Sequence, residues 1–462
     1  MLFSMASEKD PIIARSSAPG RGGIGIIRIS GSKEQVNKIS HVLFPNKQLL
    51  PRHAHLLSVA DENGALIDRA IVIRFFAPSS YTGEDVLEIQ SHGGPALLQL
   101  ILERALSVGK CVGLRPAEPG EFTKRAYLND RMDLAQAEAV ADLIEANSGA
   151  AVRAAARSLQ GEFSKRIHDI NKELTELRAY IEATIDFPEE EIDFIQSGHV
   201  NERVRSIEQK LRQLQSAAMR GKVLREGLTV VLAGAPNVGK SSLMNALSCE
   251  DVAIVTEVAG TTRDRITHAI HLDGLTVNLI DTAGVRLTED KVERIGIERT
   301  LDAVENADVV LLLKSADQTE SEAEQQALSL ILPRLREGVQ FLHVFNKIDL
   351  MDKQIKPEDD SILISAKNGD GIDALAARLK TIAGENESEE GDFLARTRHL
   401  DCLARASDHL HVLSGDAVGR TIGLDIAAEE LRLAGIALGE IVGETSSDDL
   451  LGMIFSKFCI GK

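Results

Sequence analysis

The sequence predicts a multidomain fold: an N-terminal α+β domain, an all-α helical domain, and an α/β domain inserted into the helical one. Residues 10–118 mix strand-like and helical patterns, and helical periodicity fills 121–222. Strands alternate with helices over 227–380, after which helical sequence resumes to about residue 446. One insertion explains this order more economically than four separate domains.

The N-terminal α+β domain is expected over residues 1–120. Its short apolar runs at 23–30, 69–76 and 85–90 indicate strands, and the longer apolar run at 95–106 indicates a helix.

The helical domain is expected in two parts, 121–222 and 383–462, on either side of an inserted domain at 223–382. Spacings of three and four mark one face of an amphipathic helix at Leu159, Phe163, Ile167, Ile170, Leu174, Leu177 and Ile181, and again at Val204, Ile207, Leu211 and Leu214. The acidic stretch 186–194 contains Pro188 and is expected to break the helices, and the polar, acidic segment 383–392 is expected to be a linker.

Composition excludes several classes of protein. With 44% apolar residues in 462, global disorder is not expected, and the longest apolar runs, such as 309–313, are too short to span a bilayer. The first ten residues lack the apolar core of a signal peptide. Four distant cysteines without a CxxC pair argue against a disulfide framework and a zinc site, namely Cys111, Cys249, Cys402 and Cys459. We therefore expect a cytoplasmic protein without membrane association.

The net charge of −18 does not suit a protein that coats nucleic acid non-specifically, so any RNA contact needs a local basic patch. The richest stretch contains Arg203, Arg205, Lys210, Arg212, Arg220, Lys222 and Arg225. The alternative is a solvated helix face balanced by Glu202 and Glu208.

The strongest motif is the segment 228–247, in which an apolar strand is followed by G-x-x-x-x-G-K-S and a helix. Gly234 and Gly239 let backbone N–H groups turn toward phosphates, and Lys240 reaches the terminal phosphates. The hydroxyl of Ser241 is a Mg²⁺ ligand in such loops, and the helix start adds its positive dipole end. This pattern predicts a phosphate loop.

Further motifs follow in the order of a GTP-binding domain. Thr262 offers a second hydroxyl to Mg²⁺, and Asp281 lies at the end of an apolar run that leads into D-T-A-G. Asp349, in N-K-x-D, would accept hydrogen bonds from the ring N–H and amino group of guanine, which adenine lacks. The predicted GTP-binding residues are Asn237, Val238, Gly239, Lys240, Ser241, Ser242, Thr256, Glu257, Val258, Ala259, Gly260, Thr261, Thr262, Asp281, Thr282, Ala283, Gly284, Asn346, Lys347, Asp349, Ser365, Ala366 and Lys367.

One residue departs from the common GTPase pattern. Many phosphate-loop GTPases have a Gln after the Gly of D-x-x-G, where it orients the attacking water. Here Val285 follows Gly284, and its side chain neither donates nor accepts a hydrogen bond. Hydrolysis must therefore take its water-orienting group from elsewhere.

The segments outside the GTP motifs are similar to one family. "APGRGGIGIIRISG" (18–31), "YTGEDVLEIQSHGG" (81–94), the stretch 119–144 and the terminal "FCIGK" (458–462), with an inserted G domain, resemble the MnmE (TrmE) family of tRNA-modification GTPases. The resemblance runs from about residue 11 to the end of the chain.

The resemblance implies a function. Such a protein would act with an FAD-dependent partner, MnmG, to add a (carboxymethyl)aminomethyl group to C5 of the wobble uridine in tRNA. The one-carbon unit would come from a folate, 5-formyl- or 5,10-methylene-tetrahydrofolate, bound by the N-terminal domain. That domain would form a homodimer, and the assembly with MnmG would be a heterotetramer or larger. FAD would be on the partner only.

The resemblance also assigns residues. Arg28, Glu88, Arg131 and the terminal Lys462 would bind folate, although the family often has Lys where this chain has Arg131. Without the family, the residues themselves favour a simple ion pair between Arg28 and Glu88. Cys459 would serve the modification, the alternative being a small apolar residue.

The resemblance also implies which groups would replace the missing Gln in GTP hydrolysis. The resemblance implies a K⁺ site at Asn237, Thr256, Val258 and Thr261, and Glu293 as the catalytic residue acting through a bridging water. The alternatives are that Asn237 only shapes the phosphate loop and that Glu293 pairs with Arg294 or Arg299.

Two other functions stay open at this stage. One is a ribosome-assembly or RNA-chaperone GTPase. Only one phosphate loop is present, however, and the GxxG-like segment 20–23 precedes a strand instead of joining the two helices of an RNA-binding KH module. The other is a folate-binding scaffold whose GTPase is only regulatory.

Overall fold

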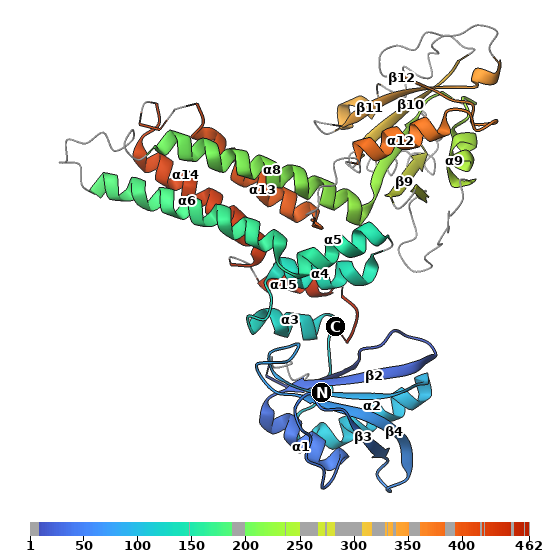
Figure 1. Cartoon of the computed structure of the whole chain (residues 1–462), viewed down its shortest axis with the longest axis vertical. Coiled ribbons are helices and arrows are strands. Elements are labelled where there is room, and N and C mark those ends of the chain that lie inside the picture. The colour runs from blue at the N-terminus through green and yellow to red at the C-terminus, as the bar shows by residue number, and fades with distance from the viewer. Residues whose placement is uncertain are drawn as a thin grey trace, which may run out of the picture. The chain divides into compact units, whose positions relative to one another are not determined.

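The computed structural model describes residues 9–146, 148–186, 199–235, 237–249, 267–272, 275–281, 307–316, 329, 331–335, 339–350, 361–383, 393–415, 418–419, 421–444, 448–456 and 458–461 (Figure 1). The chain forms two compact units. The first comprises Met1–Ile144, Ser158–Glu208 and Arg405–Lys462, and the second comprises Glu145–Arg157 and Gln209–Ala404.

The first unit begins with a six-stranded sheet of order β3-β4-β5-β2-β1-β6. Its strands are β1 (Ile12–Arg15), β2 (Gly22–Gly31), β3 (His55–Ala60), β4 (Leu66–Phe75), β5 (Asp85–Gly93) and β6 (Arg115–Pro116). Neighbouring strands are antiparallel except β1 and β6, which are parallel. The expected strands at 23–30, 69–76 and 85–90 are confirmed.

Helices α1 (Lys33–Leu43) and α2 (Pro95–Gly109) cover one face of this sheet (Figure 1). Their apolar stripes share one core with alternate residues of β2 and β5, namely Ile27, Ile29, Leu87 and Ile89. Successive strand residues point to opposite faces. Arg28 and Glu88 are therefore left on the face that the two helices do not cover.

After α2 and a 3₁₀ turn η1 (Lys110–Val112), the first unit continues with further helices: α3 (Glu121–Leu128), α4 (Leu134–Glu145), α6 (Glu162–Asp186), α14 (Leu424–Val442) and α15 (Asp448–Ser456). Helices α6 and α14 pack along each other. The predicted stripe is buried from Phe163 to Ile181, as amphipathic packing requires. Three further helices contribute residues to both units: α5 (Gly149–Leu159), α8 (Val200–Glu226) and α13 (Thr397–Val412).

The end of the chain lies against the start of the N-terminal domain. Ile460 forms an isolated bridge with Pro119, and the backbone N–H of Gly120 donates to the Cys459 carbonyl at 3.4 Å. Ser16 Oγ donates to the Gly461 carbonyl at 3.0 Å. These bonds hold the segment 458–461 beside the N-terminal sheet.

The second unit contains the α/β domain, with a six-stranded sheet of order β12-β11-β10-β7-β9-β8. The strands are β7 (Leu228–Ala233), β8 (Thr267–Leu272), β9 (Leu275–Asp281), β10 (Val309–Ser315), β11 (Gln340–Asn346) and β12 (Ser361–Leu363). All pairs are parallel except β8 with β9. Helices α9 (Lys240–Cys249) and α12 (Ile372–Ile382) pack on it, with 3₁₀ turns η2 (Leu332–Arg334) and η3 (Ile348–Leu350).

The predicted fold class is confirmed: an N-terminal α+β domain precedes helices, and an α/β domain interrupts those helices. The predicted domain boundaries stay predictions. Most of the expected break at 186–194 and of the linker at 383–392 lies outside the described residues. In the part of the chain that is described, no helix is both long and apolar enough to cross a bilayer.

Candidate functional site

The phosphate loop connects β7 to α9, the context that its sequence predicts. Gly234 and Gly239 have φ angles of +148° and +98°. A Cβ at Gly239 would lie 2.2 Å from Nδ2 of Asn346, and one at Gly234 would lie 2.3 Å from the Leu313 carbonyl oxygen. Both positions therefore require glycine for backbone conformation and for space.

Lys240 is held inside the loop. Its side chain is buried, and Nζ donates to the carbonyls of Gly234 at 2.8 Å and Ala235 at 2.9 Å. The ammonium is thus already at the concave side of the loop, where terminal phosphates bind. Ser241 and Ser242 follow at the exposed start of α9. A hydroxyl at this position would be a ligand for Mg²⁺ in such a loop.

Asn346 joins the phosphate loop to the loops that would hold the base. Its side chain is buried, and Nδ2 donates to the Val238 carbonyl at 2.8 Å. Its Oδ1 accepts from the backbone N–H groups of Lys347 at 2.8 Å and Ala366 at 3.0 Å. The sequence placed Asn346 among the GTP-binding residues, and the structure adds this bracing role.

The carboxylate of Asp349 is oriented by a buried hydroxyl. Ser365 Oγ donates to Asp349 Oδ1 at 2.7 Å, and Asp349 itself is exposed. The Ser365 hydroxyl also accepts from the backbone N–H of Asn368 at 3.3 Å. Ala366 and Lys367 form the turn beside it. A fixed acceptor here can read the donor edge of guanine.

These loops converge at one edge of the sheet. The phosphate loop follows β7, and the loops with Asp349 and Ser365 follow β11 and β12, all at carboxyl ends of parallel strands. The strand that follows β9 in sequence, β10, lies on the other side of β7, so the strand order reverses there. Ligands of open α/β sheets bind at such a switch point.

Part of the predicted site lies outside the described residues. These positions are Thr256, Glu257, Val258, Ala259, Gly260, Thr261, Thr262, Thr282, Ala283, Gly284, Glu293 and Lys462. The backbone of Asp281 ends β9 at the same sheet edge as the loops above. Asn237 is described, with an exposed side chain and a φ of +62°.

The N-terminal domain brings two predicted folate-binding residues into contact. Arg28 and Glu88 face each other across β2 and β5, and Arg28 Nε donates to Glu88 Oε1 at 2.9 Å. The Arg28 guanidinium lies over the rings of Tyr81, at 5.2 Å, and Phe122, at 5.8 Å. The ion pair that the residues alone favoured is present. Its two side chains are mostly buried, and the guanidinium packs on two aromatic rings. Burial also raises the pKa of the Tyr81 hydroxyl.

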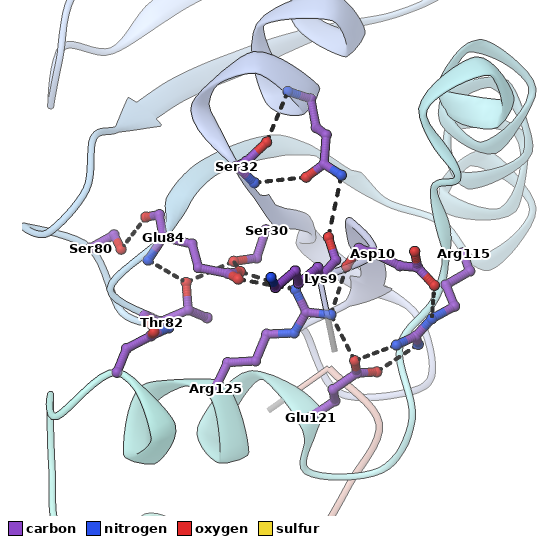
Figure 2. A network of polar contacts seen from close by, with 12 residues as sticks. Lys9, Asp10, Ser30, Ser32, Ser80, Thr82, Glu84, Arg115, Glu121 and Arg125 are labelled. Atoms are coloured by element: carbon purple, nitrogen blue, oxygen red, sulfur yellow. Dashed lines mark hydrogen bonds and ion pairs between the residues drawn. The ribbon is translucent and has the colours of Figure 1, made fainter. Parts of the chain in front are cut away.

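A polar network, which sequence reasoning did not find, supports this cluster (Figure 2). Arg125 Nη1 donates to Glu84 at 3.1 and 3.2 Å, and its Nη2 donates to Glu121 at 2.9 Å. Arg115 donates to both oxygens of Glu121, at 2.7 and 2.8 Å. Ser30 Oγ donates to Glu84 at 2.7 Å. The network fixes α3 and the segment before β5, which carries Tyr81, against the sheet.

Glu121 stays ionised in this network. Burial would raise the pKa of its carboxyl, but hydrogen bonds from Arg115, the Glu118 backbone and Arg125 hold it below the ordinary 4.5. A lowered folded-state pKa stabilises the fold at pH values above 4.5 and loses that contribution as pH falls through the folded-state pKa. At neutral pH the Glu121 carboxyl is therefore ionised and pairs with its two arginines.

Arg131 and Cys459 lie near this part of the domain. Arg131 is exposed after α3, and a Cβ at Gly83 would lie 3.2 Å from its Cγ, so its aliphatic part passes beside the segment that carries Tyr81. Cys459 is an exposed free thiol in the docked C-terminal segment.

Comparison with known proteins gives the family. Residues 134–459 match the family described as "MnmE helical domain", and residues 11–131 match "GTP-binding protein TrmE N-terminus". This chain belongs to the MnmE family. The tRNA modification GTPase MnmE of Bordetella parapertussis is 52% identical, over 98% of this chain and 99% of its own. The MnmE of Polynucleobacter asymbioticus is 49% identical, over 99% of this chain and 100% of its own.

Among solved structures, the G domain of the T. maritima FeoB iron transporter matches 34% of this MnmE-family chain and 98% of its own length. Its TM-score is 0.25, with 27% identity.

We expect Asn346→Ala to weaken guanine-nucleotide binding roughly 10- to 100-fold, or about 1.4–2.7 kcal/mol, because the side chain that braces the phosphate loop against the Ala366 turn is lost. Titration with a fluorescent GDP analogue measures this. Asn368→Ala, which removes an exposed amide from the neighbouring turn, is the matched control and should bind within about 2-fold of the unaltered protein. Equal affinities in both variants would remove Asn346 from the site.

Proposed function

We propose that this chain is a GTP hydrolase that acts in tRNA modification. The observation that carries the proposal is the set of loops at the β7 switch point, in which a phosphate loop, Asn346 and the Asp349–Ser365 pair face one sheet edge. Membership of the MnmE family gives the biological setting, since full-length relatives are named tRNA modification GTPases.

Each group of this proposed site has a role in GTP binding. Backbone N–H groups of the phosphate loop, from Asn237 to Ser242, surround the phosphates, and the Lys240 ammonium neutralises their charge. Ser241 and Thr262 would hold Mg²⁺, which supplies positive charge to the phosphate oxygens when bound. The carboxylate of Asp349 selects guanine, while the turn formed by Ser365, Ala366 and Lys367 would face the guanine carbonyl.

The finer proposal concerns the reaction on tRNA. We propose that the chain, with an FAD-dependent MnmG partner, adds a (carboxymethyl)aminomethyl group to C5 of the wobble uridine, using a one-carbon unit that the folate supplies. Arg28, Glu88, Arg131 and Lys462 would hold the folate, and Cys459 would serve the modification. We further propose a cytoplasmic homodimer joined through the N-terminal domain.

The Arg28–Glu88 cluster fits a pterin. Glu88 uses Oε1 to bind Arg28, so Oε2 remains to accept from the pterin amino group and ring N–H. The Arg28 side chain is 19% exposed and that of Glu88 14%, so a ligand displaces little water to reach them. The aromatic rings of Tyr81 and Phe122 beside Arg28 offer flat apolar surface to a planar ring system.

The proposed modification can be tested by nucleoside analysis of tRNA from cells that lack this protein. We expect loss of a 5-substituted wobble uridine and its return when the gene is restored. An unchanged nucleoside profile with defective ribosome assembly would instead support the ribosome-factor alternative.

We expect Glu88→Ala to abolish binding of 5-formyl-tetrahydrofolate and wobble-uridine modification, while GTP turnover stays within about 2-fold, because Glu88 lies in a different domain from the phosphate loop. Calorimetry measures folate affinity, and nucleoside analysis measures modification. Glu62→Ala, an exposed acid in the same domain, is the control and should bind folate normally. Full folate affinity in Glu88→Ala would contradict this site.

A further inference from the structure

A surface hollow of about 690 Å³ lies between α1, the segment after it and the end of β4. Its lining includes the cationic or imidazole side chains of Lys38, His41, Lys47 and Arg74, and its lining residues include no carboxylate. The chain as a whole carries a net charge of −18. A hollow of this composition therefore favours an anion.

Arg74 forms a rigid wall of the hollow. It is 1% exposed, and Nη2 donates to Asp85 Oδ2 at 2.6 Å and to Asn37 Oδ1 at 3.0 Å. Its guanidinium lies 5.3 Å from the centre of the Phe76 ring, and its buried Nε has no hydrogen-bond partner. A guanidinium fixed in this way, with Nη1 also 3.5 Å from Ser40 Oγ, contributes a fixed positive charge behind the wall of the hollow.

Two lysines add mobile charge at the rim. Lys38 Nζ lies 2.8 Å from Glu34 in an ion pair whose side chains are 57% and 79% exposed, so the pair is weak and exchanges readily with other anions. Lys47 is exposed, and Asn46 and Gln48 beside it offer amide donors. Ammonium groups of this kind neutralise phosphates without demanding one geometry.

The basic stretch of α8, the candidate for RNA contact from sequence, is engaged internally. Lys222 lies 3.9 Å from Asp308, and Arg225 lies 2.9 Å from Glu226. Arg205, Lys210, Arg212 and Arg220 also have partners. This agrees with the alternative of a balanced helix face. Among the described residues, the hollow is the stronger candidate for a polyanion.

We propose that the hollow bounded by Lys38, His41, Lys47 and Arg74 binds backbone phosphates of tRNA. The proposal rests on the proposed action of this chain on tRNA. The wide, open form of the hollow and the spread of its cations along α1 and the following segment suit consecutive phosphates of a strand better than one small anion enclosed on all sides. Such contacts position an RNA without reading its sequence.

The test uses two double variants. The first carries both Lys38→Gln and Lys47→Gln. The control carries both Lys33→Gln and Lys165→Gln, which removes the same charge from exposed positions outside the hollow. Arg74 is left unchanged because its loss would strand the buried Asp85. Fluorescence anisotropy measures the affinity of the full-length protein for unmodified tRNA over a salt series. We expect the first variant to bind roughly 10-fold more weakly. The slope of log affinity against log salt concentration should be smaller in magnitude by ~1–2. The control should resemble the unaltered protein, and GTP turnover should be equal in all three.

Equal tRNA affinity and salt dependence in both variants, with the unaltered protein binding tRNA, would overturn this inference and leave the proposed function intact. Absence of tRNA binding by the unaltered protein would also overturn this inference, while the proposed function would still be decided by the nucleoside analysis. Calorimetry with inorganic phosphate is the second arm. Saturable phosphate binding that the first variant loses, without a change in tRNA affinity, would assign the hollow to a small phosphate ligand and overturn the RNA contact.

Discussion

Asp349→Asn is expected to turn the nucleotide preference from GTP toward xanthosine triphosphate. Ser365 Oγ donates to Asp349 Oδ1 at 2.7 Å. Because this hydroxyl needs an acceptor, the Asn side chain is expected to place its amide oxygen where Asp349 has Oδ1. The new amide nitrogen then takes the place of the second carboxylate oxygen. Xanthine carries a carbonyl where guanine carries the amino group, so the amide donates to xanthine and opposes the guanine amino group.

The expected loss of GTP affinity is about 100- to 10,000-fold. One hydrogen bond is replaced by two opposed donors and the other loses its charged acceptor, and hydrogen bonds to a charged group are worth ~1.5–3 kcal/mol each. Xanthosine triphosphate should bind more tightly by a comparable factor. Competition against a fluorescent GDP analogue measures both. Asp373→Asn, at an exposed position in the first turn of α12, makes the same chemical change away from the base and should alter neither affinity. Undiminished GTP binding by Asp349→Asn would take this carboxylate out of the site.

Much of the fold could be predicted because its elements are long and periodic. Three strands of the N-terminal sheet, at 23–30, 69–76 and 85–90, and the stripe from Phe163 to Ile181 were found from their apolar residues, and the phosphate loop was found from its glycines. Each signal is local: the residues that identify the element also form it. The insertion followed from the order of those elements.

Helix α15 shows where the sequence pattern fell short. Helical sequence was expected to stop at about 446, yet Asp448–Ser456 form a further helix. Gly443, with a φ of +89°, ends α14, and α15 is short and contains Gly452. Its formation depends on a cluster in which Leu451, Ile454 and Phe455 pack on α4 residues such as Leu134. Contacts so distant in sequence have no local signature.

The candidate sites follow the same rule. The motifs gave the residue types of the GTP site, but they could not show that Asn346 bonds Val238, 108 positions away. In the polar network around Glu121, the pair Glu121 and Arg125 has helical i, i+4 spacing. Ser30 and Glu84 reach this network because the fold brings β2 and the segment before β5 together. Their spacing along the sequence does not indicate this contact.

Turnover is expected to be slow in Na⁺ and faster in K⁺, because Val285 cannot orient the attacking water and the missing charge must come from elsewhere. Asn237 is placed to help: it lies in the phosphate loop with a φ of +62° and an exposed side chain, so its amide oxygen is available to a cation beside the phosphates. A fixed monovalent cation there would stabilise charge on the transferring phosphoryl group as an arginine finger does. Backbone or hydroxyl oxygens of Thr256, Val258 and Thr261 are its proposed further ligands.

Glu293 is the proposed water-orienting residue, acting through a bridging water. Loss of one well-placed electrostatic group typically costs ~100- to 1,000-fold in rate, so Glu293→Ala should slow hydrolysis by about that factor while GTP still binds. Glu298→Ala, which removes an acid from the same stretch of sequence, is the matched control and should retain turnover. Phosphate release measured in KCl and in NaCl at equal ionic strength separates the cation from general salt effects.

The same cation should favour a meeting of two G domains, because closing them excludes water and strengthens the field on the γ-phosphate. With GDP and aluminium fluoride, the full-length protein is expected to bring its G domains together in K⁺ and not in Na⁺, as measured by energy transfer between labelled protomers. Equal turnover in the two salts, full activity of Glu293→Ala and unchanged energy transfer would together mean that hydrolysis relies on other groups. A K⁺ response that persists in Glu293→Ala at a reduced rate would instead separate the two roles, with the cation stabilising charge and Glu293 placing the water.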